Sequence, residues 1–150
     1  MEMFAEADRE LRALPDTDPW VKKKKAFQVA IRQQLEDWVN MQMIANELRL
    51  LYPEEEDWWI ADAYATRRSK SVENARTILL DGLALHYESA TIRYNLACYA
   101  CVMGHPGECI DFLKEAVRRE QKFEQMALED EDLVEVREAL QSLGWGSNMA

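Results

Sequence analysis

Apolar side chains recur at helical spacing along the chain. The clearest stretch has small or apolar residues at Cys109, Phe112, Leu113, Ala116 and Val117. This i, i+3, i+4, i+7, i+8 spacing places them on one face of an α-helix. Two earlier stretches have the same spacing: Ala75, Ile78, Leu79, Gly82 and Leu83, and then Met41, Ile44, Ala45 and Leu48, where only Arg49 interrupts the face. The pattern therefore predicts a repeat of about 34 residues.

The segments that precede these helices repeat with the same period. Between "WWIADAYATRR" and "RYNLACYACVM", Ile60 aligns with Tyr94 and Ala63 with Ala97. Each segment is followed by a short break, "SKS" at residues 69–71 and "GHPG" at residues 104–107. Pro106 is compatible with a first helical turn, where its missing N–H would have no partner in any case. Each repeat is therefore predicted to be a helix, a tight turn and a second helix.

A further amphipathic helix is predicted at each end of the chain. Near the N-terminus the apolar positions are Phe4, Ala7, Leu11 and Leu14, and Pro15 ends the helix. Within residues 124–145 they are Leu133, Val136, Leu140 and Leu143, and acidic residues at 130–132 favour a helix N-terminus. Stacked helices expose an apolar face at their ends, so we expect these two helices to act as caps.

These features resemble the tetratricopeptide repeat (TPR), a 34-residue helix-turn-helix with small residues where its helices cross. The matching residues in the third repeat are "YNLACYA", Gly104, Cys109, Leu113 and Ala116. Those in the second repeat are Trp59, Ala63, Ala75, Leu79 and Gly82, and Pro53 closes the first repeat. The resemblance implies an all-α fold, a TPR-type α-solenoid of antiparallel helix pairs with N- and C-terminal capping helices.

The resemblance also divides the chain, taken as a single domain of residues 1–150, into five parts. These are an N-terminal capping helix and linker (1–21), three repeats (22–55, 56–89 and 90–123), and a C-terminal capping helix and tail (124–150).

TPR proteins bind a peptide or helix of a partner in a concave groove, so the resemblance implies a non-enzymatic adaptor or scaffold. The principal groove candidates are Ile60, Ala61, Tyr64, Arg67, Arg68, Tyr94, Asn95 and Cys98. Repeat one would add Lys23, Ala26, Phe27, Ala30, Gln33 and Gln34. Tyrosine and arginine often anchor interfaces. A small acidic secretion-type chaperone is an alternative, because some such bacterial chaperones carry three similar repeats, and a homodimer also stays open.

The charge and composition of the chain limit the kinds of partner that we expect. The chain has 18 basic and 28 acidic residues, a net charge of -10, which repels phosphate backbones and anionic membrane surfaces. We therefore expect no nucleic-acid partner and no membrane partner. The N-terminal residues do not read as a secretory signal, and three closely spaced cysteines fit a reducing compartment, so the sequence predicts a cytoplasmic protein.

The three cysteines raise a different possibility. Cys98, Cys101, His105 and Cys109 form a C-x2-C-x3-H-x3-C pattern, which could indicate zinc binding or thiol redox chemistry. On the predicted helices Cys98 and Cys101 share the groove face, whereas Cys109 faces the helix crossing, so we expect the side chains to diverge. Buried cysteine also packs as a small hydrophobe. We favour the packing role, with no metal or cofactor, and keep a metal or redox protein as the alternative from another class.

No catalytic motif accompanies these residues. The sequence contains no glycine-rich phosphate loop, no nucleophile elbow and no HExxH pair. It therefore predicts no catalytic residues and no enzyme.

Overall fold

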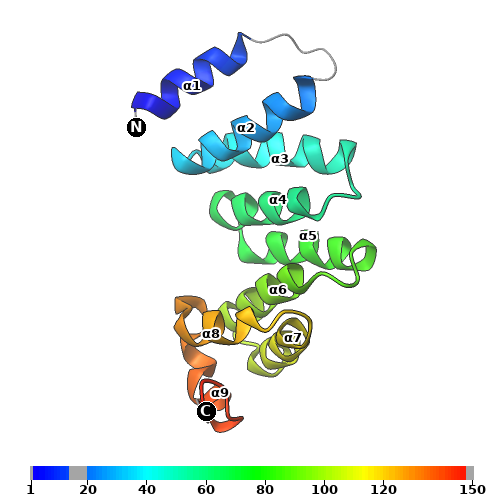
Figure 1. Ribbon diagram of the computed structural model, residues 1–150, viewed down its shortest axis with the longest axis vertical. Coiled ribbons are helices and arrows are strands. Elements are labelled where there is room, and N and C mark those ends of the chain that lie inside the picture. Colours follow the sequence, from blue (N-terminus) through cyan, green and yellow to red (C-terminus); the bar gives the residue numbers. More distant parts are fainter. Residues whose placement is uncertain (1, 14–19, 148–150) are drawn as a thin grey trace. The chain divides into compact units, whose positions relative to one another are not determined.

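The computed structural model describes residues 2–13 and 20–147 (Figure 1). The described residues form helices and no strand, which confirms the predicted all-α class. None of the described helices is long and apolar enough to cross a membrane. The chain forms two compact units, Met1–Ile78 and Leu79–Ala150, and each is described on its own. That both belong to a single domain stays a prediction.

The described residues of the first unit form four complete helices. They are α1 (Glu2–Arg12), α2 (Trp20–Gln34), α3 (Trp38–Leu51) and α4 (Glu56–Ser69), and α5 (Val72–Leu85) crosses the boundary into the second unit. α1 lies against α2, α2 packs on α3, and α3 packs on α4. The core between α2, α3 and α4 is formed by Val29, Met41, Ala45, Leu48 and Ala65.

The second unit contains one long helix pair followed by shorter segments. The pair is α6 (Ala90–Val102) and α7 (Pro106–Arg119), which pack on each other. The segments that follow are α8 (Lys122–Glu129), the 3-10 helix η1 (Glu131–Val136) and α9 (Arg137–Ser142). α8 packs on α7, and η1 packs mainly on α6.

Helix boundaries recur with the predicted period. α3, α5 and α7 begin at residues 38, 72 and 106, and α4 and α6 begin at residues 56 and 90, so every step equals the period predicted from the sequence. α4 and α5 are separated by residues 70–71, at the predicted turn. The turn between α6 and α7 contains Gly104 at φ +83°, a conformation that glycine adopts without strain, and Pro106 begins α7 as expected. The predicted helices and turns of residues 56–119 are therefore confirmed.

The residues that define the repeat are buried. Alanine recurs at one position of the first helices, where Ala63 and Ala97 are both completely buried. On the second helices, three sets of equivalent positions are buried: Met41, Ala75 and Cys109; Ala45, Leu79 and Leu113; and Leu48, Gly82 and Ala116. Small side chains at several of these positions let neighbouring helix backbones approach closely. The repeat pattern is therefore a packing pattern.

Asp62 is a buried carboxylate in the first unit. Its side chain, on α4, is 0% exposed and accepts hydrogen bonds from three residues of α3. These are Gln42 Nε2 at 3.0 Å, Asn46 Nδ2 at 3.3 Å and Arg49 Nε at 2.8 Å. The Thr66 hydroxyl donates to it at 3.1 Å from one turn further along α4. Because the three donors lie at i, i+4 and i+7, a single stripe of α3 is held against one point of α4.

This contact explains why Arg49 interrupts the apolar repeat. The equivalent positions are Leu83 and Val117, which are partly buried. Arg49 is partly buried as well, but its guanidinium pairs with Asp62 and lies 4.8 Å from the centre of the Trp59 ring. The charge is therefore paired and covers an aromatic face.

The two predicted end helices differ from expectation in extent. α1 spans Glu2–Arg12, and Leu14 and Pro15 lie outside the described residues. The helix predicted at 124–145 is instead divided into α8, η1 and α9. The division falls at Asp130, whose extended backbone ends α8 and whose carboxylate accepts the Asp132 N–H to begin η1. Three of the four predicted stripe residues are nonetheless buried, and they are Leu133, Val136 and Leu140.

Replacement of Asp62 by Ala is expected to destabilise the fold by about 3 kcal/mol, because Arg49 and two amide side chains lose a buried acceptor. Urea unfolding followed by helical circular dichroism measures this loss. Asp57→Ala, an exposed acid on the same helix, serves as the control and should cost less than about 1 kcal/mol. Equal losses in the two variants would contradict the role of Asp62.

Replacement of Ala116 by Leu is expected to lower the free energy of unfolding by about 1 to 3 kcal/mol, because the completely buried site has no room for three more carbons. Lys114→Leu adds the same side chain at an exposed position of α7 and should change stability by less than about 0.5 kcal/mol. An unchanged thermal midpoint for Ala116→Leu would mean that the repeat register is misplaced.

Candidate partner-binding surfaces

The predicted groove residues come from two helices in different units. Those on α4 are Ile60, Ala61, Tyr64, Arg67 and Arg68. Those on α6 are Tyr94, Asn95 and Cys98. Each group is described within its own unit, and its role in binding stays a prediction.

Three residues of the first unit form a surface of one cation and two aromatic rings, which we call the Arg68 surface. The Arg68 guanidinium lies 3.6 Å from the centre of the Tyr64 ring and 5.2 Å from that of Trp38. The two rings meet edge to face at 5.7 Å. Arg68 is exposed, and its Nη1 donates to the Tyr64 carbonyl at 3.0 Å. The guanidinium is therefore held in place by ring faces while remaining open to solvent.

The other predicted residues of α4 are more enclosed. Ile60, Ala61 and Arg67 are partly buried. Ala61 and Tyr64 pack against the core of the first unit. Arg68 is therefore the most accessible of the five α4 candidates.

Two of the three α6 candidates are buried, whereas the sequence predicts exposed groove positions. Tyr94 and Cys98 are each only 4% exposed. The Tyr94 ring stacks on Phe123 of α8 at 4.7 Å, and its hydroxyl donates to Asp130 Oδ2 at 2.8 Å. The Cys98 Sγ lies 3.7 Å from the same oxygen. The C-terminal segment thus covers Tyr94 and Cys98, whereas Asn95 is partly exposed.

Burial of these groups favours their neutral forms. It is the main cause that raises the pKa of the Tyr94 hydroxyl, and the nearby Cys98 and Asp130 raise it further. Burial likewise raises the pKa of the Cys101 thiol, and it raises that of the Cys109 thiol to about 12. A thiol must lose its proton to act as a nucleophile, so Cys101 and Cys109 are poorly suited to redox or covalent chemistry.

The four residues of the Cys/His pattern are divided among different partners. Cys101 and Cys109 interact through their side chains, so the expectation that these two thiols diverge is wrong. His105 is exposed, with its Nδ1 3.5 Å from Glu108. Cys98 faces Asp130 instead.

A second group of possible metal ligands was not predicted from the sequence. Potential ligand atoms of Cys98, Asp130 and Asp132 lie within 4.8 Å of one another. The two aspartates lie far beyond Cys98 in the sequence, and no spacing motif connects them. The Asp130 carboxylate already accepts the Tyr94 hydroxyl and the Asp132 N–H, so it serves the packing of η1 on α6.

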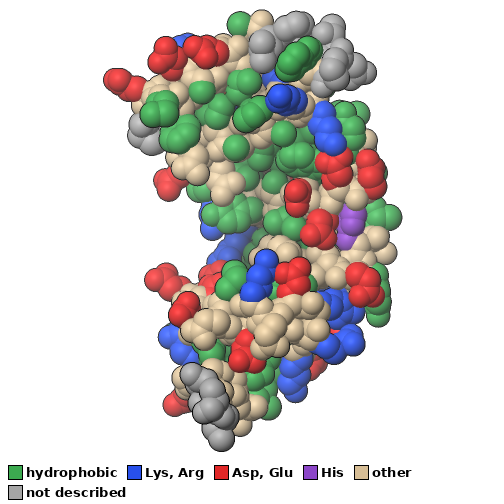
Figure 2. Space-filling model, viewed as in Figure 1, with side chains coloured by type: hydrophobic (Ala, Val, Ile, Leu, Met, Phe, Trp, Pro, Cys, Tyr) green, Lys and Arg blue, Asp and Glu red, His purple; other side chains and the backbone are tan. Residues whose placement is uncertain are grey.

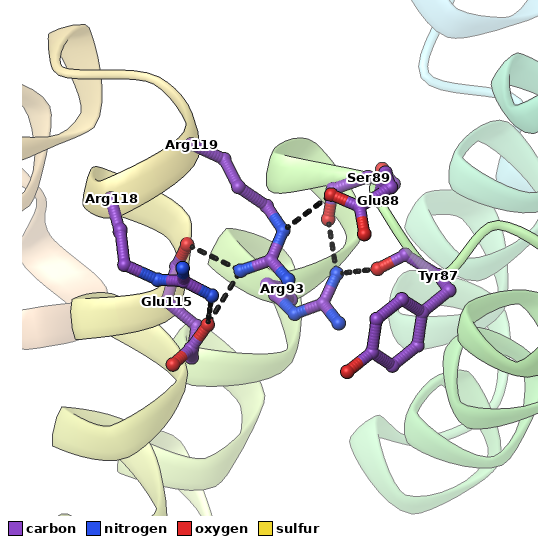
Figure 3. Close-up of polar contacts among 7 residues, drawn as sticks. All are labelled: Tyr87, Glu88, Ser89, Arg93, Glu115, Arg118 and Arg119. Carbon is purple, nitrogen blue, oxygen red and sulfur yellow. Dashed lines mark hydrogen bonds and ion pairs between the residues drawn. The ribbon is translucent and has the colours of Figure 1, made fainter.

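Arg93 and Arg119 lie at the centre of a polar cluster in the second unit, in which Arg118 also pairs with Glu115 (Figure 3). Arg93 is 5% exposed, and its Nη1 donates to the carbonyls of Tyr87 and Ser89. Burial is the main cause that lowers its pKa, and the neighbouring charge of Arg119 acts in the same direction. Arg119 pairs with Glu115 of α7 at 2.5 Å.

A second ion pair completes this cluster. Arg119 Nε lies 3.4 Å from Glu88, which belongs to the segment before α6. Because Arg93 holds two carbonyls of the same segment, the cluster joins that segment to α6 and α7. These contacts stabilise the packing of that segment on α6 and α7.

An apolar pocket of about 640 Å³ lies between α1 and α2, and we call it the α1–α2 pocket. Four predicted groove residues of repeat one line it, and they are Phe27, Ala30, Gln33 and Gln34. α1 contributes mainly apolar side chains, of which Phe4, Ala7 and Leu11 were expected to form a cap. Figure 2 shows hydrophobic and acidic side chains close together over α1 and α2, at the top of the view. The amphipathic pattern of α1 thus signalled its apolar face but not the pocket.

No protein-family model matches the chain, and no curated protein matches it either.

Raising the pH above about 9 should weaken the contribution of Cys109 to stability. Between about pH 9 and 12 the folded chain keeps the Cys109 proton and the unfolded chain releases it, so the folded state binds more protons. The contribution of the Cys109 thiol to the free energy of unfolding has its full value below about pH 9, and above that pH it falls by up to about 1.4 kcal/mol per pH unit.

Cys109→Ala removes the thiol, and with it this pH-dependent contribution to stability, while keeping a small side chain. The stability difference between wild type and Cys109→Ala, measured by urea unfolding at pH 7 and pH 10, should shrink at the higher pH. A difference that stays constant would indicate that the thiol is not held in its neutral form.

Proposed function

We propose that the protein is a non-enzymatic, TPR-type protein-binding module that acts as a cytoplasmic adaptor or scaffold. The observation that carries the proposal is the regular recurrence of helix boundaries together with the burial of equivalent small residues. Helical repeats built in this way present extended surfaces, and their binding depends on those surfaces rather than on a few reactive atoms.

The surface chemistry of the first unit supports this proposal. Several large apolar side chains there are about half exposed or more, and they are Phe27, Val39, Met43, Leu50 and Leu51. Small residues occupy the buried crossing positions instead, as Ala45 and Ala63 do. Exposed apolar groups of this kind are typical of surfaces that meet another protein.

The Arg68 surface is the proposed contact for a partner peptide. An arginine held against Trp38 and Tyr64 loses little side-chain freedom when it binds, and its guanidinium can donate to a carboxylate or a carbonyl. The adjacent aromatic rings can cover apolar side chains. The preferred peptide therefore combines apolar residues with an acidic group or a free C-terminus.

Arg68→Ala is expected to weaken partner binding by about thirtyfold, as loss of a central interface anchor commonly does. The partner is first recovered by affinity capture from the native cells, and its affinity for each variant is then measured with purified proteins. Lys114→Ala on α7 removes an exposed cation elsewhere and is the matched control. Loss of binding in the control with retention in Arg68→Ala would contradict the proposal.

A further inference from the structure

We infer that the α1–α2 pocket is a separate docking site for an amphipathic helix of a partner protein that carries a lysine or arginine beside its apolar face. This inference does not depend on the Arg68 surface. It follows from the shape of the pocket, the kinds of groups that line it and the charge along its edge.

The shape leaves room for side chains from outside. Small residues, Ala7 of α1 and Ala30 of α2, line the pocket together with the larger Phe4, Leu11 and Phe27. Phe27 is 51% exposed, so an apolar ring is left in contact with water. The volume of about 640 Å³ lies in the range of sites that enclose ligands, and large apolar side chains can enter the space beside the alanines.

The lining favours a helix over an extended peptide. Its polar side chains are Glu10, Gln33 and Gln34, and the other lining residues are apolar. An extended peptide would bury backbone N–H and C=O groups here with few partners, which is unfavourable. A helix satisfies its own backbone and presents apolar side chains at i, i+3, i+4 and i+7. α1 and α2 would then form two walls of a three-helix arrangement.

The charges of α1 indicate the sign of the charge that the partner helix would carry. Glu2, Glu6 and Glu10 are exposed at i, i+4 and i+8, and Glu10 lines the pocket itself. Asp8 is different, because it is 5% exposed and pairs with Arg12 and Arg32. No cation is among the lining residues. Arg9 and Lys23 are also exposed, but neither of them lines the pocket. A lysine or arginine on the partner would therefore meet the Glu10 carboxylate where it enters the pocket.

The same charges disfavour a second copy of this chain as the occupant. Each copy has a net charge of -10, and it would bring its own acidic α1 toward the acidic edge of the other. Like charges brought together at an interface oppose association.

The test uses a fluorescein-labelled synthetic helix of about 18 residues, long enough to populate helix, with a leucine face and lysine flanks. A second probe has the same face and glutamate flanks. Fluorescence anisotropy with the full chain should give at least about tenfold tighter binding for the lysine-flanked probe. Equal affinities, or no binding of the lysine-flanked probe, would overturn the inference.

Two substitutions, each with a matched control, locate the site. Ala30→Trp fills the pocket from an exposed position and should weaken binding of the lysine-flanked probe at least about tenfold. Val39→Trp, at an exposed position of α3, should leave that binding unchanged. Glu10→Lys should reduce the preference for the lysine-flanked probe, and Glu73→Lys, an equal charge change at an exposed position of α5, should preserve it. Unfolding midpoints are measured for all four variants, so that loss of binding is separated from loss of fold. Retained binding in Ala30→Trp, or equal effects within either pair, contradicts the site.

Other occupants give distinct results that would also overturn the inference. Dimers seen by sedimentation and abolished by Ala30→Trp would mean that a second copy fills the pocket. A co-purified apolar molecule that native mass spectrometry detects, and that Ala30→Trp removes, would mean a small-molecule site. If only Arg68→Ala weakens the probe, the Arg68 surface binds it and this inference fails while the proposed function stands. The reverse pattern supports the pocket and leaves the Arg68 proposal to its own test.

Discussion

Close approach of neighbouring helices is the constraint on which the rest of this structure depends. Completely buried alanines at 45, 63, 97 and 116 have no side chain beyond Cβ, so the backbones opposite them can come near. Small buried positions recur with the period of the repeat, and they restrict what each helix can carry on its inner face. Larger apolar residues such as Phe27 and Leu50 lie at exposed positions. The same constraint thus shapes the interior and leaves apolar groups available for binding.

Polar exceptions distinguish the repeats from one another. Arg49 replaces an apolar repeat residue and pairs with the buried Asp62, so the register of α3 on α4 depends on ionic hydrogen bonds as well as packing. Arg93 occupies the position of Trp59 in the preceding repeat and holds the carbonyls of the segment before α6. In both cases the substituted charge has several partners. These residues make adjacent repeats non-equivalent despite their shared period.

The sequence predicts the helices well because their inner faces repeat. Cys109, Leu113 and Ala116 could be assigned to one buried face from spacing alone, and they are buried. Periodicity does not reveal what lies opposite a face. The contact of Tyr94 with Asp130 joins residues 36 positions apart, and no local pattern shows that η1 covers α6. The α1–α2 pocket escaped prediction for the same reason, because it depends on how one amphipathic helix lies against another.

The central claim is that the first unit binds a partner through its exposed α1, α2 and α4 surfaces. Hydrogen exchange of backbone amides, followed by mass spectrometry with and without the partner captured from native cells, tests it most directly. Binding is predicted to slow exchange in peptides covering α1 to α2 or the end of α4, while peptides from α7 exchange at unchanged rates. Protection confined to α7, or no protection in the first unit at a saturating partner concentration, would contradict the account.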